Sequence, residues 1–124
     1  MRLLLSASAF AIALLWVLAP SPSTAQGGNG EAAFRQRCAA CHTTDANRTS
    51  PTGPNLRGVV GRKAGTATFA FSAALKQSNI VWTTENLDRF LVAPAKVVPG
   101  TRMIASVADA GQRRAIIQYL STQR

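Results

Sequence analysis

Residues 34–44 read FRQRCAACHTT and hold both cysteines and the only histidine of this 124-residue chain. Phe34, Cys38 and Cys41 recur at i, i+4 and i+7, which is the spacing of one helical face. The residues before Cys38, EAAFRQR, are mostly good helix formers. We therefore expect a helix that carries both thiols on one face and ends near His42.

The Cys-x-x-Cys-His pattern is compatible with four kinds of site. A disulfide between Cys38 and Cys41 would close a very short loop and restrain almost nothing. A thioredoxin-like thiol pair opens a helix, whose N-terminus lowers the thiol pKa, whereas this pair is expected at the end of one. A zinc site needs four ligands, and the sequence has no second ligand cluster. The fourth possibility is covalent haem attachment, for which this pattern is a recognised signal.

Two features of the whole chain favour the haem interpretation. Because His42 is the only histidine, no other imidazole could bind the iron. If Met1 leaves with an N-terminal leader, Met103 is the only remaining methionine, and a thioether is the usual partner of histidine on electron-transfer haem iron. A lone methionine is commonly core filler. Met103, however, follows a turn at Pro99-Gly100, as a ligand approaching from across the ring would.

The first 25 residues predict a secretory signal peptide. Arg2 precedes a long apolar run that ends at Pro20, and small residues at 23 and 25 suit cleavage after Ala25. The alternative is an uncleaved anchor, because the apolar run is at the lower limit for a membrane-spanning helix. Cleavage leaves residues 26–124 as one domain in the bacterial periplasm. A domain of about 100 residues buries a limited share of its surface, so a bound cofactor would help it fold.

The chain is strongly basic. Fourteen Lys and Arg face five Asp and Glu, a formal charge of +9, and loss of Arg2 with the leader lowers it to +8. We expect no nucleic-acid partner, since the protein is exported and has no helix-turn-helix, finger or aromatic RNA-binding motif. The expected partners are acidic protein surfaces or anionic lipid. Membrane contact is expected only through partner complexes or an uncleaved leader.

The pattern along the chain predicts a small all-α domain of three to four helices with long loops. Residues 27–30 are expected to be a flexible lead-in, and residues 43–68, rich in Gly, Pro, Thr and Asn, a long loop. The expected helices cover residues 31–42, 72–77, Thr83 or Thr84 to Pro94, and a terminal helix that opens at a Ser106-x-x-Asp109 capping box and carries Ile116, Ile117 and Leu120. No strand or internal repeat is predicted.

At this point the sequence resembles the class I cytochromes c, of the mitochondrial type and its soluble bacterial relatives. The resemblance covers nearly all of residues 27–124. The matching pieces stand in the family's order: Gly30, Phe34, Cys38-Ala39-Ala40-Cys41-His42, Gly53-Pro54-Asn55-Leu56, Gly61-Arg62-Lys63, Ile80-Val81-Trp82, Pro94, Pro99-Gly100-Thr101-Arg102-Met103 and Tyr119-Leu120. So many ordered matches make coincidence an inadequate explanation.

The resemblance implies a small cytochrome c fold wrapped around one covalently bound haem c, and a role for each matching residue. Cys38 and Cys41 would form the thioethers, and His42 and Met103 would be the axial ligands. Pro54 matches the proline whose carbonyl accepts the histidine's other ring proton. The remaining implied positions are Arg62 and Trp82, near a buried haem propionate; Thr101, a further hydrogen-bonding position; and Gly30, Phe34 and Tyr119, at the crossing of the first and last helices.

The implied function is that of a monomeric one-electron carrier rather than an enzyme, because two axial ligands leave no open position on the iron. It would accept electrons from a quinol-oxidising complex or a periplasmic dehydrogenase and deliver them to a terminal oxidase or reductase. The alternative is a haem c subunit held permanently in a periplasmic oxidoreductase complex. A third interpretation, a haem peroxidase or gas sensor, would require Met103 to be detached from the iron.

Overall fold

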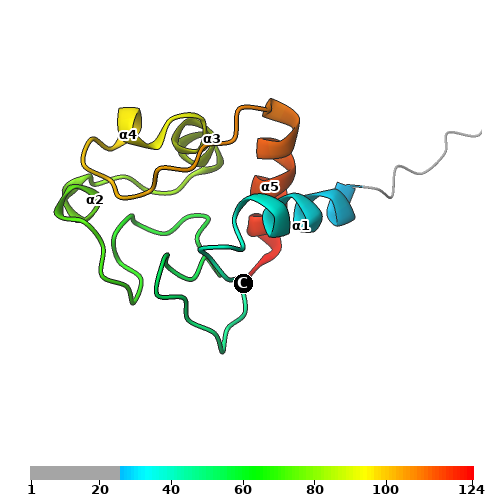
Figure 1. Ribbon diagram of the computed structural model, residues 1–124, viewed down its shortest axis with the longest axis horizontal. Coiled ribbons are helices and arrows are strands. Elements are labelled where there is room, and N and C mark those ends of the chain that lie inside the picture. The colour runs from blue at the N-terminus through cyan, green and yellow to red at the C-terminus, as the bar shows by residue number, and fades with distance from the viewer. Residues whose placement is uncertain (1–25) are drawn as a thin grey trace, which may run out of the picture.

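The computed structural model describes residues 26–124, and the expected signal peptide, residues 1–25, lies outside them. Figure 1 shows the long first and last helices crossing at one end, with the shorter helices and the irregular chain on the other side. Within the described residues there are five helices, one more than the upper number expected, and one isolated bridge between Lys63 and Val81 in place of a sheet. The helices are α1 (Gln26–Arg37), α2 (Ala73–Gln77), α3 (Thr84–Val92), α4 (Pro94–Val97) and α5 (Ala110–Thr122).

The crossing of α1 and α5 is where the first and last helices pack, as expected. Gly30 is buried in α1, and a Cβ there would lie 2.3 Å from the Ala115 carbonyl oxygen of α5. One turn later the Phe34 ring packs against the Tyr119 ring, with 5.3 Å between centroids. Ile116 is completely buried beneath this contact region. The glycine allows the two backbones to approach, and the apolar side chains then exclude water.

The expected lead-in at residues 27–30 is wrong, because α1 already begins at Gln26. Glycine weakens an isolated helix by about 1 kcal/mol relative to alanine, which is why composition predicted a flexible segment. In the folded chain the close packing of Gly30 against α5 offsets that preference. Tertiary contact therefore decides the start of this helix.

Side-chain caps define the beginnings of α2, α3 and α5. The Ser72 side chain accepts the Leu75 amide at the start of α2, and Thr83 accepts the Asn86 amide at the start of α3. The expected capping box at Ser106 is wrong, because α5 begins after Asp109, whose carboxylate accepts the Gln112 amide at 2.7 Å. Ser106 lies in the preceding irregular chain.

Pro94 has a second role that its sequence position does not predict. It ends α3, as expected, but it also occupies the first turn of α4, where its missing N–H is not needed. The four-residue helix α4 was not among the expected helices. It leads directly into the chain that carries Met103.

The long loop between the Cys-His motif and α2 is confirmed. Its middle part joins the core through Val59 and Ala64, which are 2% and 1% exposed. Backbone hydrogen bonds attach this part to the chain before α3: Ala64 donates to Ile80 at 2.8 Å, and Trp82 donates to Arg62 at 2.9 Å. The loop is therefore an ordered wrap around the core, although it has little regular structure.

Candidate haem site

The two cysteines and the histidine lie on a single helical turn that follows α1. The Cys38 amide donates to the Phe34 carbonyl at 2.8 Å, and the His42 amide donates to the Cys38 carbonyl at 2.9 Å. The regular helix, however, ends at Arg37, so the expectation that it continues to His42 is wrong by one turn. Local hydrogen bonds still keep the i, i+3 relation between Cys38 and Cys41, and both thiols remain half-buried.

The surroundings of the thiols argue against a thiol oxidoreductase. Both cysteines are free, and they follow the C-terminus of α1 instead of its N-terminus. Burial, reinforced by the neighbouring Cys41, raises the pKa of the Cys38 thiol to about 11. A redox-active cysteine requires the opposite shift, because the thiolate is the nucleophile.

A metal site made of these side chains alone is also not formed. Within residues 26–124, no group of three or more His, Cys, Asp or Glu side chains is arranged to hold a metal ion. Cys38, Cys41 and His42 follow one another on the turn without converging on one point. This arrangement does not match the tetrahedral ligand set of a zinc site.

His42 is held by the loop that returns past the motif. Its Nδ1 lies 2.8 Å from the Pro54 carbonyl oxygen, so the ring donates from Nδ1 and leaves Nε2 with a free lone pair. Burial lowers the pKa of His42, and the bond to Pro54 opposes this shift. The ring is therefore presented neutral, in the tautomer that a metal ligand requires.

Two residues that the sequence does not mark as site residues support this arrangement. A Cβ at Gly53 would lie 2.7 Å from both His42 Cε1 and the Cys41 carbonyl oxygen, so only glycine lets the loop pass this closely. The Ser50 hydroxyl donates to the same Cys41 carbonyl at 2.8 Å. Gly53 had a signal in the sequence, since it precedes Pro54 in a matching motif, but Ser50 had none.

Arg62 and Trp82, expected near a haem propionate, are brought together by the fold. The Trp82 amide donates to the Arg62 carbonyl at 2.9 Å. The Arg62 guanidinium donates to the carbonyls of Arg57 at 3.0 Å and Asn55 at 3.2 Å. The Trp82 ring is 7% exposed and packs 4.8 Å from the Phe90 ring. The pair thus links the long loop to α3 at the edge of the core.

Met103 lies in the irregular segment between α4 and α5. Its side chain is half-buried and packs against the core. Its amide donates to the Thr101 hydroxyl at 3.4 Å. Met103 therefore reaches the core from a part of the sequence far from the Cys-His turn.

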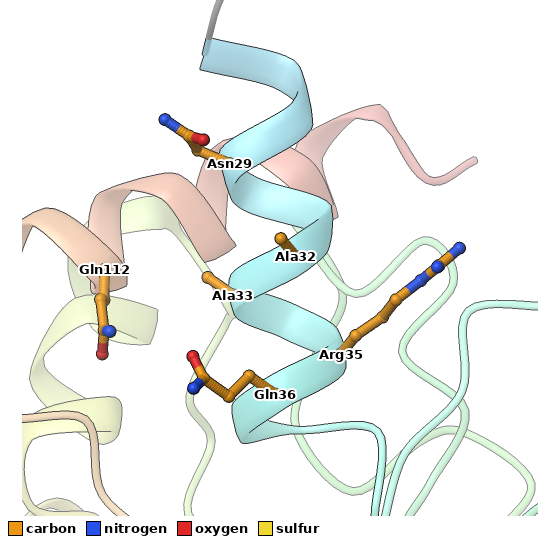
Figure 2. A pocket seen from close by; sticks show the side chains of 6 residues that line it. All are labelled: Asn29, Ala32, Ala33, Arg35, Gln36 and Gln112. Carbon is orange, nitrogen blue, oxygen red and sulfur yellow. The ribbon is translucent and has the colours of Figure 1, made fainter.

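A separate hollow of about 710 Å³ lies beside α1 (Figure 2). It is lined by Asn29, Ala32, Ala33, Arg35, Gln36 and Gln112. Figure 2 shows the Gln36 side chain extending towards the side on which Gln112 projects from α5. The lining contains no thiol, imidazole or carboxylate, so this hollow offers no ligands for a metal or haem.

The donor set at the Cys-His turn fits a covalently attached haem. Two thiols three residues apart on a helical turn are about 5 to 6 Å apart at Cβ, the separation needed to reach two substituents of one macrocycle. His42 offers Nε2, and Met103 offers a thioether. No buried residue of the described chain is polar or charged. Half-buried apolar side chains adjoin the core: Leu56, Val60, Leu75, Ile80 and Val97.

Comparison with known proteins gives the family. Residues 28–124 match the sequence model described as cytochrome c. Cytochrome c 2.1 of Caenorhabditis elegans is 42% identical over 96 residues, which cover 76% of this chain and 86% of that protein. The cytochrome c-type cyt cy of Rhodobacter capsulatus is 39% identical over 105 residues, 83% of this chain and 52% of that protein.

A solved structure supports the same family assignment. Cytochrome cH from Methylobacterium extorquens superposes with a TM-score of 0.69 at 42% sequence identity, covering 77% of this chain and 97% of that one. The fold and site therefore define a small helical haem protein, and the chain belongs to the cytochrome c family. It is an electron carrier whose cofactor is covalently attached haem c. No enzyme family is indicated by these comparisons.

Proposed function

We propose that this protein is a periplasmic one-electron carrier with a single haem c ligated by His42 and Met103. It moves electrons from a quinol-oxidising complex or a periplasmic dehydrogenase to a terminal oxidase or reductase. When bound, the haem supplies a one-electron iron couple. The chain supplies ligands, a low-dielectric surround and a surface for partners.

Each residue has a stated task in this proposal. Cys38 and Cys41 hold the haem through thioethers. His42 binds the iron through Nε2, while the bond from Nδ1 to the Pro54 carbonyl fixes the ring and raises its basicity. Met103 would supply the other protein ligand of the iron, and a thioether ligand raises the reduction potential.

Two further residues are assigned to the propionate side of the haem, and a third, Thr101, to the segment before Met103. The Arg62 guanidinium and the Trp82 indole offset the negative charge of a buried propionate. Thr101 steadies the segment before Met103 through its bond to the Met103 amide.

The observation that carries the proposal is the 2.8 Å contact between His42 Nδ1 and the Pro54 carbonyl oxygen. A carbonyl can only accept, so the proton is on Nδ1 and the lone pair is on Nε2. In a site with two free thiols on the same helical turn, that lone pair has a specific use as an iron ligand.

Partner choice follows from the surface charge. Eleven of the thirteen basic residues in the described chain are exposed, and the ion pairs found there are Arg35–Glu31 and Arg113–Asp88. Most of the positive charge is therefore free to attract acidic partner surfaces. Electron exchange with an acidic redox protein should slow as salt is added, since surface attraction is screened over about 10 Å at 0.1 M salt.

Absorption spectroscopy of the purified protein in both redox states tests the ligand assignment. We expect sharp reduced haem c bands and, in the oxidised protein, a weak near-infrared sulfur-to-iron band. Met103→Ala should abolish the sulfur band. Ile104→Ala is the matched control, because Ile104 is adjacent but 97% exposed, and it should leave the band intact. A wild-type haem spectrum without the sulfur band would refute Met103 ligation.

A further inference from the structure

The carbonyl of Cys41 lies directly before His42 and takes no part in the backbone hydrogen bonds of their turn. Within that turn the Cys38 carbonyl accepts the Cys41 amide at 3.0 Å and the His42 amide at 2.9 Å. The Cys41 carbonyl accepts no backbone amide of the described chain. The hydrogen bond found for it there comes from the Ser50 hydroxyl at 2.8 Å, and both residues are half-buried. Because a carbonyl shielded from water needs a donor, Ser50 is the side chain that satisfies it.

The peptide unit between Cys41 and His42 couples this carbonyl to the imidazole ring. A peptide unit is planar, so the Cys41 oxygen cannot change direction without turning the bond that leads into His42. The oxygen and the ring also share a neighbour. A Cβ at Gly53 would lie 2.7 Å from the Cys41 oxygen and 2.7 Å from His42 Cε1. A change in the direction of the carbonyl would therefore move the imidazole relative to the Gly53 backbone.

The Ser50 hydroxyl is itself held in a defined orientation. Its Oγ accepts the Thr52 amide at 3.3 Å, and a carbonyl can only accept, so the hydroxyl proton points to Cys41. The loop around Ser50 is closed by the Asn55 side-chain amide, which donates to the Asp45 carbonyl at 2.7 Å. The donor is thus fixed by contacts of its own, which do not involve the imidazole ring.

We propose that Ser50 is a positioning residue for the histidine ligand: its hydroxyl fixes the Cys41 carbonyl, and the planar peptide passes that constraint to the His42 ring. This inference rests on the proposed ligation of iron by His42. The imidazole makes two directed contacts, one from Nδ1 to the Pro54 carbonyl at 2.8 Å and one, in the loaded protein, from Nε2 to the iron. Both depend on the orientation of the ring, so loss of the Ser50 donor turns the ring and weakens its bond to Pro54.

Proton NMR of the haem-loaded protein tests this inference with two readouts. In the oxidised protein, the paramagnetic shifts of the haem methyl groups depend on the plane of the axial imidazole, so their pattern reports the orientation of the ring. In the reduced protein, the His42 Nδ1 proton exchanges with solvent when its bond to Pro54 opens. For Ser50→Ala we expect a changed methyl pattern and roughly two- to tenfold faster exchange of that proton, the effect of losing one neutral hydrogen bond.

Two variants are the matched controls. Ser50→Thr keeps the hydroxyl and should retain the wild-type methyl pattern. Thr49→Ala removes a hydroxyl from the adjacent residue, which is exposed and whose side chain makes no hydrogen bond found within residues 26–124. Both readouts should equal those of the wild type in Thr49→Ala.

A wild-type methyl pattern in Ser50→Ala would overturn the assignment even if the Nδ1 proton exchanged faster, because that combination indicates lower stability and an unmoved ring. An equal change of pattern in Thr49→Ala or in Ser50→Thr would overturn it as well. Wild-type His42 ring resonances without the shifts of an iron ligand would instead refute the underlying His42 ligation.

Discussion

The crossing of α1 and α5 predicts a large effect of a single methyl group at residue 30. In Gly30→Ala the new Cβ would lie 2.3 Å from the Ala115 carbonyl oxygen and 2.9 Å from the Tyr119 Cβ. Ordinary contacts begin at 3.4 Å. Both neighbours belong to the α5 main chain or are attached directly to it, so neither can rotate away. The two helices must separate by about 1 Å.

The cost of this separation can be worked from the buried side chains. Phe34, Ile116 and Leu120 are each at most 4% exposed on these two helices, and burial of such a side chain contributes about 2 kcal/mol. A gap of up to about 1 Å forfeits a quarter to a half of the attraction across it. The expected loss is therefore about 1.5–3 kcal/mol, or a fall in melting temperature of roughly 6–24 °C.

Gly111→Ala provides the control. Gly111 is also helical, but a Cβ there would meet only the Asp109 carboxylate at 3.1 Å and the end of the Arg114 side chain at 4.0 Å. Both variants share much of the helix propensity gained from alanine, so the difference between them isolates packing. Urea unfolding of the haem-loaded proteins measures that difference. Equal free energies of unfolding for the two variants would refute the reasoning.

Three further outcomes are expected. Ile116→Ala, at a completely buried position, should lower the free energy of unfolding in urea by about 2–5 kcal/mol, and a loss below 1 kcal/mol would contradict the core assignment. Gly53→Ala should push the His42 ring from its place, because the new Cβ would lie 2.7 Å from Cε1; an unchanged reduction potential in an equilibrium redox titration would count against this. Hydrogen bonds from its own amide and from neighbouring threonine hydroxyls lower the pKa of Glu85 below the ordinary 4.5. The ionised form therefore stabilises the fold above that pH, and the stability is lost as pH falls through the lowered pKa. Glu85→Gln should melt below the wild type at pH 7, and the gap should close in acid.

Elements defined by local chemistry were predicted well from the sequence. The caps at Ser72 and Thr83 begin helices where expected, and Pro94 ends one. A cap works within one helical turn, so neighbouring residues suffice to identify it. The capping box at Ser106 failed although the same rule applies. Asp109 made the cap instead, because the chain up to Ala108 is held outside the helix by Arg113.

The candidate site likewise has a part that lies within a few neighbouring residues and a part that comes from distant segments. Cys38, Cys41 and His42 are neighbours in the chain, so their pattern, together with the single histidine and the single methionine expected after the leader, favoured haem attachment. The roles of Pro54, Arg62, Trp82 and Thr101 came from resemblance to a family, since nothing in their spacing brings them near the motif. Met103 was already favoured as a ligand, because it is the only methionine expected after the leader. Their haem contacts remain predictions, whereas the bond between His42 and Pro54 is present in the structure.

The sequence by itself indicated the class of cofactor, and it determined the close spacing of the two thiols and the strongly basic character of the chain. These depend on residue type and short spacing, which are properties of the sequence and do not require a folded structure. Only the tertiary structure decided that a glycine-rich start becomes helical, that Gly53 passes against the His42 ring, and that the Arg102 guanidinium donates to the Ala70 carbonyl. Each of these is a contact between distant segments, and it exists only once the core has brought those segments together.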